Sequence, residues 1–173
     1  MTKRTITVFP GDGIGPDIVE SACKVLDALE AGLDYERVQA GKVALEEGRE
    51  LIPQETMDSI RRNKVVLKGP LTTPLGEGYT SVNVTLRKTF ELFANVRPVV
   101  SFPGTKSRYD NIDIITVREN TEGMYSGIGQ TINEDRTYGD ARTVVTREEP
   151  VRLIRFTLDV AGRMGRRKVT VGH

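Results

Sequence analysis

Four side chains in this sequence, Asn83, Arg87, Arg97 and Arg118, are placed where they could bind an anion. Asn83 and Arg87 are four residues apart in a segment with helical periodicity, so they share one face of the expected helix. Arg97 follows that segment, and Arg118 ends a strand-like run. A guanidinium pairs with a carboxylate through two hydrogen bonds, so converging arginines would suit a polyanionic metabolite. From spacing alone, arginines scattered over the surface in salt bridges explain the same pattern.

Three strand-like runs are followed by unusual sequences, in residues 10–15, 68–74 and 118–120. Ligands of open α/β sheets collect beyond the carboxyl ends of the strands, so these segments are candidates for a site. Residues 10–15 contain glycines spaced G-x-G-x-G, which is not the G-x-G-x-x-G of the dinucleotide fingerprint. A tight turn therefore explains these glycines better than a nucleotide site.

Hydrophobic periodicity predicts alternating strands and helices, which indicates a mainly parallel sheet covered on both faces. The expected strands are residues 5–9, 65–67, 112–117 and 168–171. The expected helices are residues 14–29, 53–62, 81–95 and 150–164. The inner face expected for the last helix consists of Val151, Ile154, Leu158 and Ala161.

The composition excludes several classes of function. The 173 residues include 25 basic and 24 acidic side chains, a net charge of +1, which argues against a broad nucleic-acid or polybasic membrane surface. Cys23 is the only cysteine and His173 the only histidine, so neither a disulfide framework nor a His-based metal cage is expected. No apolar run reaches the ~20 residues of a membrane span. Without a signal peptide, we expect a cytoplasmic protein.

Five segments of the sequence occur in an order that is typical of one enzyme family. They are Gly11-Asp12-Gly13-Ile14-Gly15-Pro16, Lys68-Gly69-Pro70-Leu71-Thr72-Thr73-Pro74, Ser81-Val82-Asn83-Val84-Thr85-Leu86-Arg87, Phe93-Ala94-Asn95-Val96-Arg97-Pro98 and Arg118-Glu119-Asn120-Thr121-Glu122-Gly123-Met124-Tyr125. With them the chain resembles the β-decarboxylating dehydrogenases, which act on isocitrate, isopropylmalate or homoisocitrate. The resemblance implies an isopropylmalate-dehydrogenase-like three-layer α/β/α fold with a mainly parallel sheet, not a Rossmann fold, truncated to its amino-terminal half.

The resemblance also implies a reaction and its participants. NAD or NADP takes hydride from the substrate, Mg²⁺ or Mn²⁺ polarises the 2-oxo group, carbon dioxide leaves, and the enolate is protonated. By position, Tyr125 matches the tyrosine that helps protonate the enolate, and Thr72 matches a threonine near the nicotinamide. The positions that match the family's substrate contacts are Ser81, Asn83, Arg87, Arg97 and Arg118.

The side chains at the start of the expected helix 81–95 bear on substrate choice. Thr80, Ser81 and Asn83 can hydrogen-bond the third carboxylate of isocitrate, whereas an isopropyl group would leave them unpaired. We therefore expect isocitrate, a tricarboxylate, with homoisocitrate or isopropylmalate as alternatives. Phosphorylation of Ser81 would add about −1.5 to −2 charges where a substrate carboxylate should bind, and block the site.

The resemblance places the catalytic lysine, the metal-binding aspartates and most of the adenosine-binding segment beyond His173. No metal ligand is assigned in this chain, because Asp12, Asp110 and Asp113 show no pattern of a shared ligand set. We expect the chain to be inactive by itself. A non-catalytic fragment or partner-binding subunit is the alternative from another functional class.

Two parts of the family's architecture are expected. Residues 1–98 would belong to the large domain, and residues 99–173 would begin the small domain. Residues 126–145 resemble the clasp hairpin that two subunits exchange, so we expect a homodimer when the protein is complete.

Overall fold

The computed structural model describes residues 3–72, 81–123 and 125–172. The chain divides into two compact units, Met1–Thr85 and Leu86–His173. The division falls within helix α4 (Val82–Thr89). It is a division by internal contacts, and the family's domain boundary near residue 98 stays a prediction.

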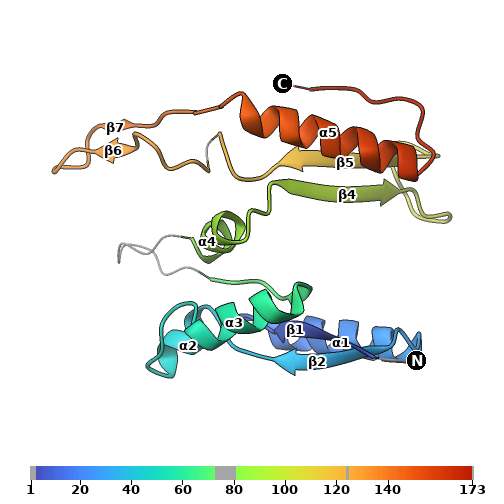
Figure 1. The fold of residues 1–173 in the computed structure, drawn as a ribbon, viewed down its shortest axis with the longest axis horizontal. Coiled ribbons are helices and arrows are strands. Elements are labelled where there is room, and N and C mark those ends of the chain that lie inside the picture. The colour runs from blue at the N-terminus through green and yellow to red at the C-terminus, as the bar shows by residue number, and fades with distance from the viewer. Residues whose placement is uncertain (1–2, 73–80, 124, 173) are drawn as a thin grey trace. The chain divides into compact units, whose positions relative to one another are not determined.

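The first unit contains a parallel sheet. Its three strands have the order β2-β1-β3, and β1 runs parallel to both neighbours. Figure 1 shows β1 beside its neighbour β2. The elements before α4 are β1 (Arg4–Phe9), α1 (Gly15–Ala28), β2 (Leu33–Arg37), α2 (Lys42–Glu46), α3 (Gln54–Asn63) and β3 (Val66–Lys68). The predicted alternation of strands and helices is confirmed here.

Side chains of β1 alternate between two helices. Ile6 and Val8 form a buried core with Val19 of α1, whereas Thr7 hydrogen-bonds Ser59 of α3, with 2.7 Å between the hydroxyl oxygens. Successive side chains of a strand point to opposite faces, so α1 and α3 cover opposite sides of this sheet. The arrangement has the three α/β/α layers that the sequence predicts.

The second unit contains two antiparallel pairs of strands and one long helix. The elements after α4 are β4 (Ala94–Val100), β5 (Asp113–Glu119), β6 (Thr131–Ile132), β7 (Gly139–Asp140) and α5 (Glu148–Arg163). β4 pairs with β5, and β6 pairs with β7 to form a hairpin within the clasp-like segment. α5 packs against β5, and an edge-to-face contact between Phe93 and Phe156 helps to fix it, with the ring centroids 5.5 Å apart.

The prediction of one helix over residues 81–95 is wrong in its second half. α4 ends at Thr89, and β4 begins at Ala94. Glu91 has a φ of 49°, and the Leu92 amide donates to the Arg87 carbonyl at 2.8 Å, which is the six-residue bond of a Schellman cap. Glycine usually occupies the left-handed position of this cap. Because glutamate occupies it here, the sequence gave no indication that the helix ends at this point.

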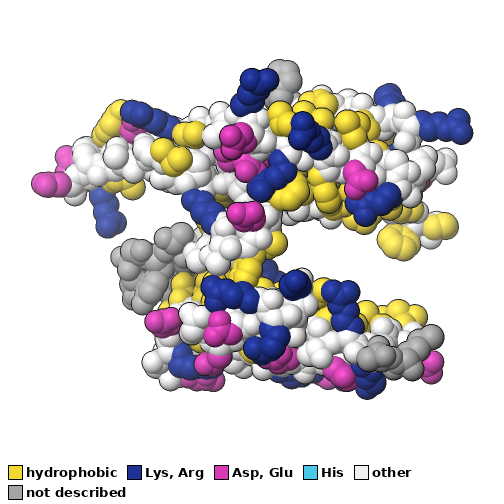
Figure 2. All heavy atoms as spheres, in the orientation of Figure 1, with side chains coloured by type: hydrophobic (Ala, Val, Ile, Leu, Met, Phe, Trp, Pro, Cys, Tyr) yellow, Lys and Arg dark blue, Asp and Glu magenta, His cyan; other side chains and the backbone are white. Residues whose placement is uncertain are grey.

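The inner face predicted for α5 is wrong at three of its four residues. Val151, Ile154 and Leu158 are 39%, 46% and 55% exposed, whereas Ala161 is half-buried as predicted. Leu153, Phe156, Thr157 and Val160 are half-buried as well. The helix has apolar residues on two sides, and its packing against β5 selects one of them. Figure 2 shows exposed apolar side chains beside basic ones over the α5 part of the chain.

Residues 168–171 were expected to form a strand, but the structure has none there. A strand needs a hydrogen-bonded neighbour, and within the described residues β5 pairs only with β4. None of the helices among the described residues has the length and hydropathy needed to span a bilayer.

Candidate functional site

Arg118 and Tyr125 form the centre of the candidate site. Arg118 lies near the end of β5, and its Nη2 donates a hydrogen bond to Tyr125 Oη at 2.5 Å. Arg87, from α4, lies over the same aromatic ring, and the Cζ atoms of both arginines are 5.3 Å from the ring centroid. Guanidinium groups within about 6 Å of an aromatic face are attracted to it. Three of the residues predicted for the site therefore come together.

Arg97 joins this group through the pairing of β4 with β5. Asn95 lies opposite Arg118, and Arg97 lies opposite Thr116, so these four side chains share one face of the strand pair. Arg97 and Arg118 are thus diagonal neighbours, and Arg97 Nε donates to Asn95 Oδ1 at 3.0 Å. Sequence reasoning missed Asn95. Its signal was the two-residue spacing from Arg97, which the expected helix concealed.

The arginines of this site form no ion pair with the acidic residues that the structure describes. Within residues 3–72, 81–123 and 125–172, no ion pair involves Arg87, Arg97 or Arg118. Scattered surface salt bridges are therefore the wrong explanation for these three residues. Their charges are left for an anion from solution, and several guanidinium forks in one place match several carboxylates.

Glu119, the acidic residue next to Arg118 in the sequence, is hydrogen-bonded within its own turn. Its carboxylate accepts hydrogen bonds from the Thr121 amide and hydroxyl, both at 2.7 Å, and from the Glu122 amide at 2.9 Å. Burial raises the pKa of the Glu119 carboxyl, but the hydrogen bonds from Thr121 and Glu122 outweigh it, so the pKa lies below its ordinary value. Asn120, 6% exposed, donates to the Leu92 carbonyl at 3.1 Å and anchors the turn to the segment after α4.

Ser81 and Asn83 lie at the start of α4. The Ser81 carbonyl accepts a hydrogen bond from the Thr85 amide at 2.9 Å, which begins the helix, and the side chains of Ser81 and Asn83 are half-buried. Both residues belong to the first unit, so their position beside the arginines stays a prediction. Thr80 lies outside the described residues.

Asp12 is the second residue that sequence reasoning missed, after Asn95, and it accepts a hydrogen bond from the backbone of Thr72. The Thr72 amide donates to Asp12 Oδ2 at 2.6 Å. The same carboxylate accepts from the Lys42 amide at 3.2 Å and the Val43 amide at 3.1 Å, and so caps the start of α2. Asp12 is only 6% exposed, and its place within the glycine-rich segment was the only available signal.

The glycines around Asp12 are required by close packing of the backbone. A Cβ atom on Gly69 would lie 1.7 Å from the Pro10 carbonyl oxygen, and one on Gly11 would lie 2.0 Å from the Pro70 carbonyl oxygen. Gly11 also has a φ of 77°. Together with the amides that Asp12 occupies, these contacts indicate a packed turn and not a cradle for phosphate, as the spacing predicted.

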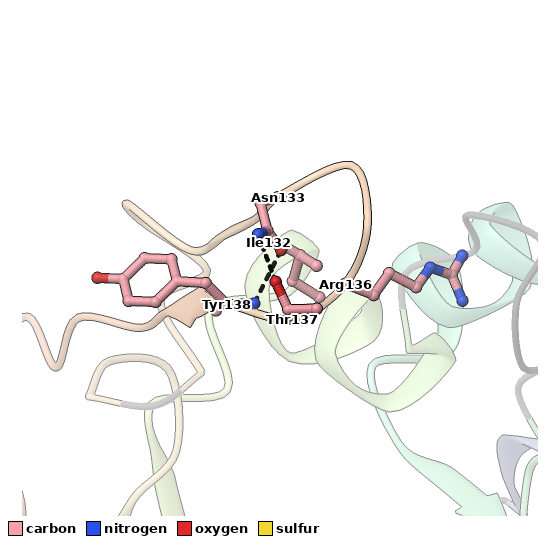
Figure 3. A pocket seen from close by; sticks show the side chains of 6 residues that line it. Ile132, Asn133, Arg136, Thr137 and Tyr138 are labelled. Carbon is pink, nitrogen blue, oxygen red and sulfur yellow. Dashed lines mark hydrogen bonds between the residues drawn. The ribbon is translucent and has the colours of Figure 1, made fainter.

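A hollow at the β6–β7 turn lies apart from Arg87, Arg97 and Arg118 in the sequence, and Asn133 and Thr137 in its lining hydrogen-bond within the turn. Asn133 Nδ2 donates to Thr137 Oγ1 at 3.0 Å, and Asn133 Oδ1 accepts from the Tyr138 amide at 2.8 Å (Figure 3). The Tyr138 ring and the Arg136 side chain extend from this turn in opposite directions. The hollow is therefore a feature of the turn itself.

Ligands for a metal ion are not assembled in the described part of the chain. No group of three or more His, Cys, Asp or Glu side chains there could hold one. The arrangement that the described residues build is a pair of guanidinium groups against one tyrosine, with a third arginine on the neighbouring strand. The fold and the site together define an α/β protein with a cluster of arginines at the end of a strand.

Comparison with known proteins identifies the family. The model of the isocitrate/isopropylmalate dehydrogenase family matches residues 5–173, and the chain belongs to this family. It is 43% identical to the mitochondrial isocitrate dehydrogenase [NAD] subunit 2 of Schizosaccharomyces pombe over 98% of the chain and 44% of that protein. It is 45% identical to the isocitrate dehydrogenase [NADP] of Thermus thermophilus over 96% of the chain and 34% of that protein.

A solved structure confirms the isocitrate/isopropylmalate dehydrogenase fold. The crystal structure of isocitrate dehydrogenase from Methylococcus capsulatus superposes with a TM-score of 0.88 at 46% identity, over 95% of this chain and 49% of that one. The chain therefore spans about half or less of the length of the relatives it matches.

Proposed function

We propose that the complete protein oxidatively decarboxylates isocitrate to 2-oxoglutarate and reduces NAD or NADP. The observation that carries this proposal is the placement of Arg87 and Arg118 against Tyr125, with Arg97 diagonal to Arg118 on the strand pair. Within the described residues none of the three arginines forms an ion pair. Relatives named isocitrate dehydrogenases, with NAD in one name and NADP in another, support the reaction class. Ser81 and Asn83 favour a third carboxylate over an isopropyl group.

In this proposal the arginines bind and orient the substrate's carboxylates, and Tyr125 delivers a proton. A tyrosine hydroxyl both accepts and donates. Because Arg118 already donates to Tyr125 Oη, the phenolic proton remains free for the enolate carbon. The reaction also needs Mg²⁺ or Mn²⁺, which would stabilise the enolate, but the described residues do not fit such an ion, and its ligands are expected elsewhere in the complete protein. Thr72 is the residue proposed to contact the cofactor.

The test is the reduction of NAD and NADP by the complete protein with isocitrate, homoisocitrate and isopropylmalate in parallel. Turnover with isocitrate is expected to exceed turnover with the other two. No reduction with any of the three would overturn the proposal in favour of a non-catalytic subunit. A clear preference for isopropylmalate would overturn the assignment of isocitrate as the substrate.

The Arg118→Lys enzyme provides the residue-level test. Lysine keeps the charge but loses the planar fork, so KM for isocitrate should rise roughly 10- to 100-fold. Arg108→Lys is the matched control, because Arg108 also lies 5.3 Å from a tyrosine ring, that of Tyr109, in an exposed segment. Equal effects of the two substitutions would argue against a substrate role for Arg118.

A further inference from the structure

The segment of residues 126–145 is fastened at its base, directly beside Tyr125. Glu122 precedes Tyr125, and Thr146 follows the end of the segment. Glu122 Oε2 accepts from the Thr146 amide at 2.9 Å, and Glu122 Oε1 accepts from the Thr146 hydroxyl at 2.8 Å. The Gly123 amide also donates to the Val144 carbonyl at 2.9 Å. Hydrogen bonds from the Glu122 side chain and the Gly123 backbone thus join the two ends of the segment.

Thr146 also lies at the start of α5. Its hydroxyl is 3.5 Å from the Glu149 amide, in the first turn of that helix. The Tyr125 amide in turn donates to the Glu122 carbonyl at 3.3 Å. Thr146 and Glu122 therefore connect the start of α5, a helix of 16 residues, to the backbone of Tyr125.

A second anchor holds the other side of Tyr125. Lys88 of α4 donates to the Ser126 carbonyl at 2.7 Å. With Ser126 held by α4 and Glu122 held at α5, the tyrosine backbone is fixed from both sides, and its hydroxyl reaches Arg118. Each oxygen of the Glu122 carboxylate accepts a hydrogen bond from Thr146, so the carboxylate is held at the base of the segment.

From this geometry we propose that Glu122 and Thr146 are positioning residues, which hold Tyr125 Oη against Arg118. The proposal deepens the proposed function and rests on it for the catalytic consequence. Loss of the contact should let Tyr125 leave Arg118 while the three arginines remain. Substrate binding would then survive, and proton delivery would suffer.

The test has two separate readouts in the complete protein. A 3-fluorotyrosine at position 125 reports the surroundings of the ring by ¹⁹F NMR, whether or not the protein is an enzyme. Glu122→Gln and Thr146→Val should each move this resonance toward that of an exposed tyrosine, and their double variant should move it little further, because both break one contact. Thr146→Ser keeps the hydroxyl and should restore the native position.

The second readout is steady-state kinetics. Glu122→Gln should lower kcat about tenfold with KM for isocitrate nearly unchanged, unlike Arg118→Lys, which acts on KM. Glu134→Gln, at an exposed glutamate within the 126–145 segment, is the control and should change neither readout.

The outcomes separate this inference from the proposed function. An unmoved ¹⁹F resonance in both Glu122→Gln and Thr146→Val overturns the positioning role, even if activity falls. A moved resonance with unchanged kcat upholds the positioning role and overturns Tyr125 as the proton donor. If Glu122→Gln fails to fold, the result for Thr146→Val decides on the positioning role. This variant keeps the hydrogen bond from the backbone amide of residue 146 to Glu122 and removes only the hydroxyl.

Discussion

The loops at the ends of β1 and β5 are both candidate ligand sites by their sequences. In the structure their charged side chains differ, because Asp12 in one loop is bonded to the protein and Arg118 in the other is exposed. After β1, the Asp12 carboxylate is buried and takes three backbone amides, and Gly11 and Gly69 admit close backbone contacts. At the end of β5, Arg118 is exposed, forms no ion pair within the described part of the chain and donates to a tyrosine hydroxyl. The location at a strand end is shared. What distinguishes a ligand site is whether its polar groups are already satisfied by the protein.

The largest effect that would test this contrast is expected at Gly69. Gly69→Ala places a methyl group 1.7 Å from a backbone carbonyl oxygen that cannot move freely. We expect the free energy of unfolding to fall by about 4 kcal/mol, beyond ordinary overpacking, as measured by urea denaturation. Gly162→Ala is the control, since nothing lies within 4 Å of its Cβ and helical alanine stabilises by roughly 0.5–1 kcal/mol. A small loss of unfolding free energy for Gly69→Ala would mean that the backbone around Pro10 can move to accommodate the methyl group.

A somewhat smaller effect is expected at Asp12. Asp12→Ala leaves three amide donors without their carboxylate, and should cost about 3 kcal/mol of unfolding free energy. In the complete enzyme, the milder Asp12→Asn should raise KM for the nicotinamide cofactor through Thr72 and leave KM for isocitrate unchanged. Asp110→Ala, at an exposed aspartate, is the control. A change confined to isocitrate would contradict the division of roles between the two loops.

The smallest effect is expected at Glu119, through pH. The folded pKa lies below the ordinary value of 4.5, so the ionised group adds stability above that pH, and this stability is lost as the pH falls through the folded pKa. Glu119→Gln should therefore lower the free energy of unfolding at neutral pH by about 1 kcal/mol or less, because the group is partly exposed, and the difference should vanish as the pH falls below the folded pKa. Urea denaturation across this range checks it, with Glu134→Gln as the control. A difference that grows in acid would contradict the assignment.

Local patterns predicted the site better than they predicted element boundaries. Arg87, Arg118 and Tyr125 come together as expected, because a motif after a strand and a helix face are local features. Asn95 was missed, because the cap at Glu91 uses a residue type that does not indicate a helix end. Asp12 was missed because its partners, Lys42 and Thr72, are distant in the sequence.

Predictions that depended on a partner surface were less successful. α5 has two apolar stripes, and only its packing on β5 decides which one is covered. Residues 168–171 have the composition of a strand, but within the described chain no strand pairs with them. Periodicity identifies an element's faces, whereas the choice between them belongs to tertiary contacts.

The Asp12 junction also has a consequence for the order of folding. Its bond to Thr72 joins residues 60 apart, whereas the Asn133 bond that closes the β6–β7 turn spans five. Short loops close within about 10–100 ns and hairpins form in about 1–10 μs, but contacts distant in sequence wait for longer loops to close. α2 has only five residues, too few for a stable isolated helix. We therefore expect the turn at Asn133 to form early, and α2 to form only after Asp12 has reached the amides of its first turn.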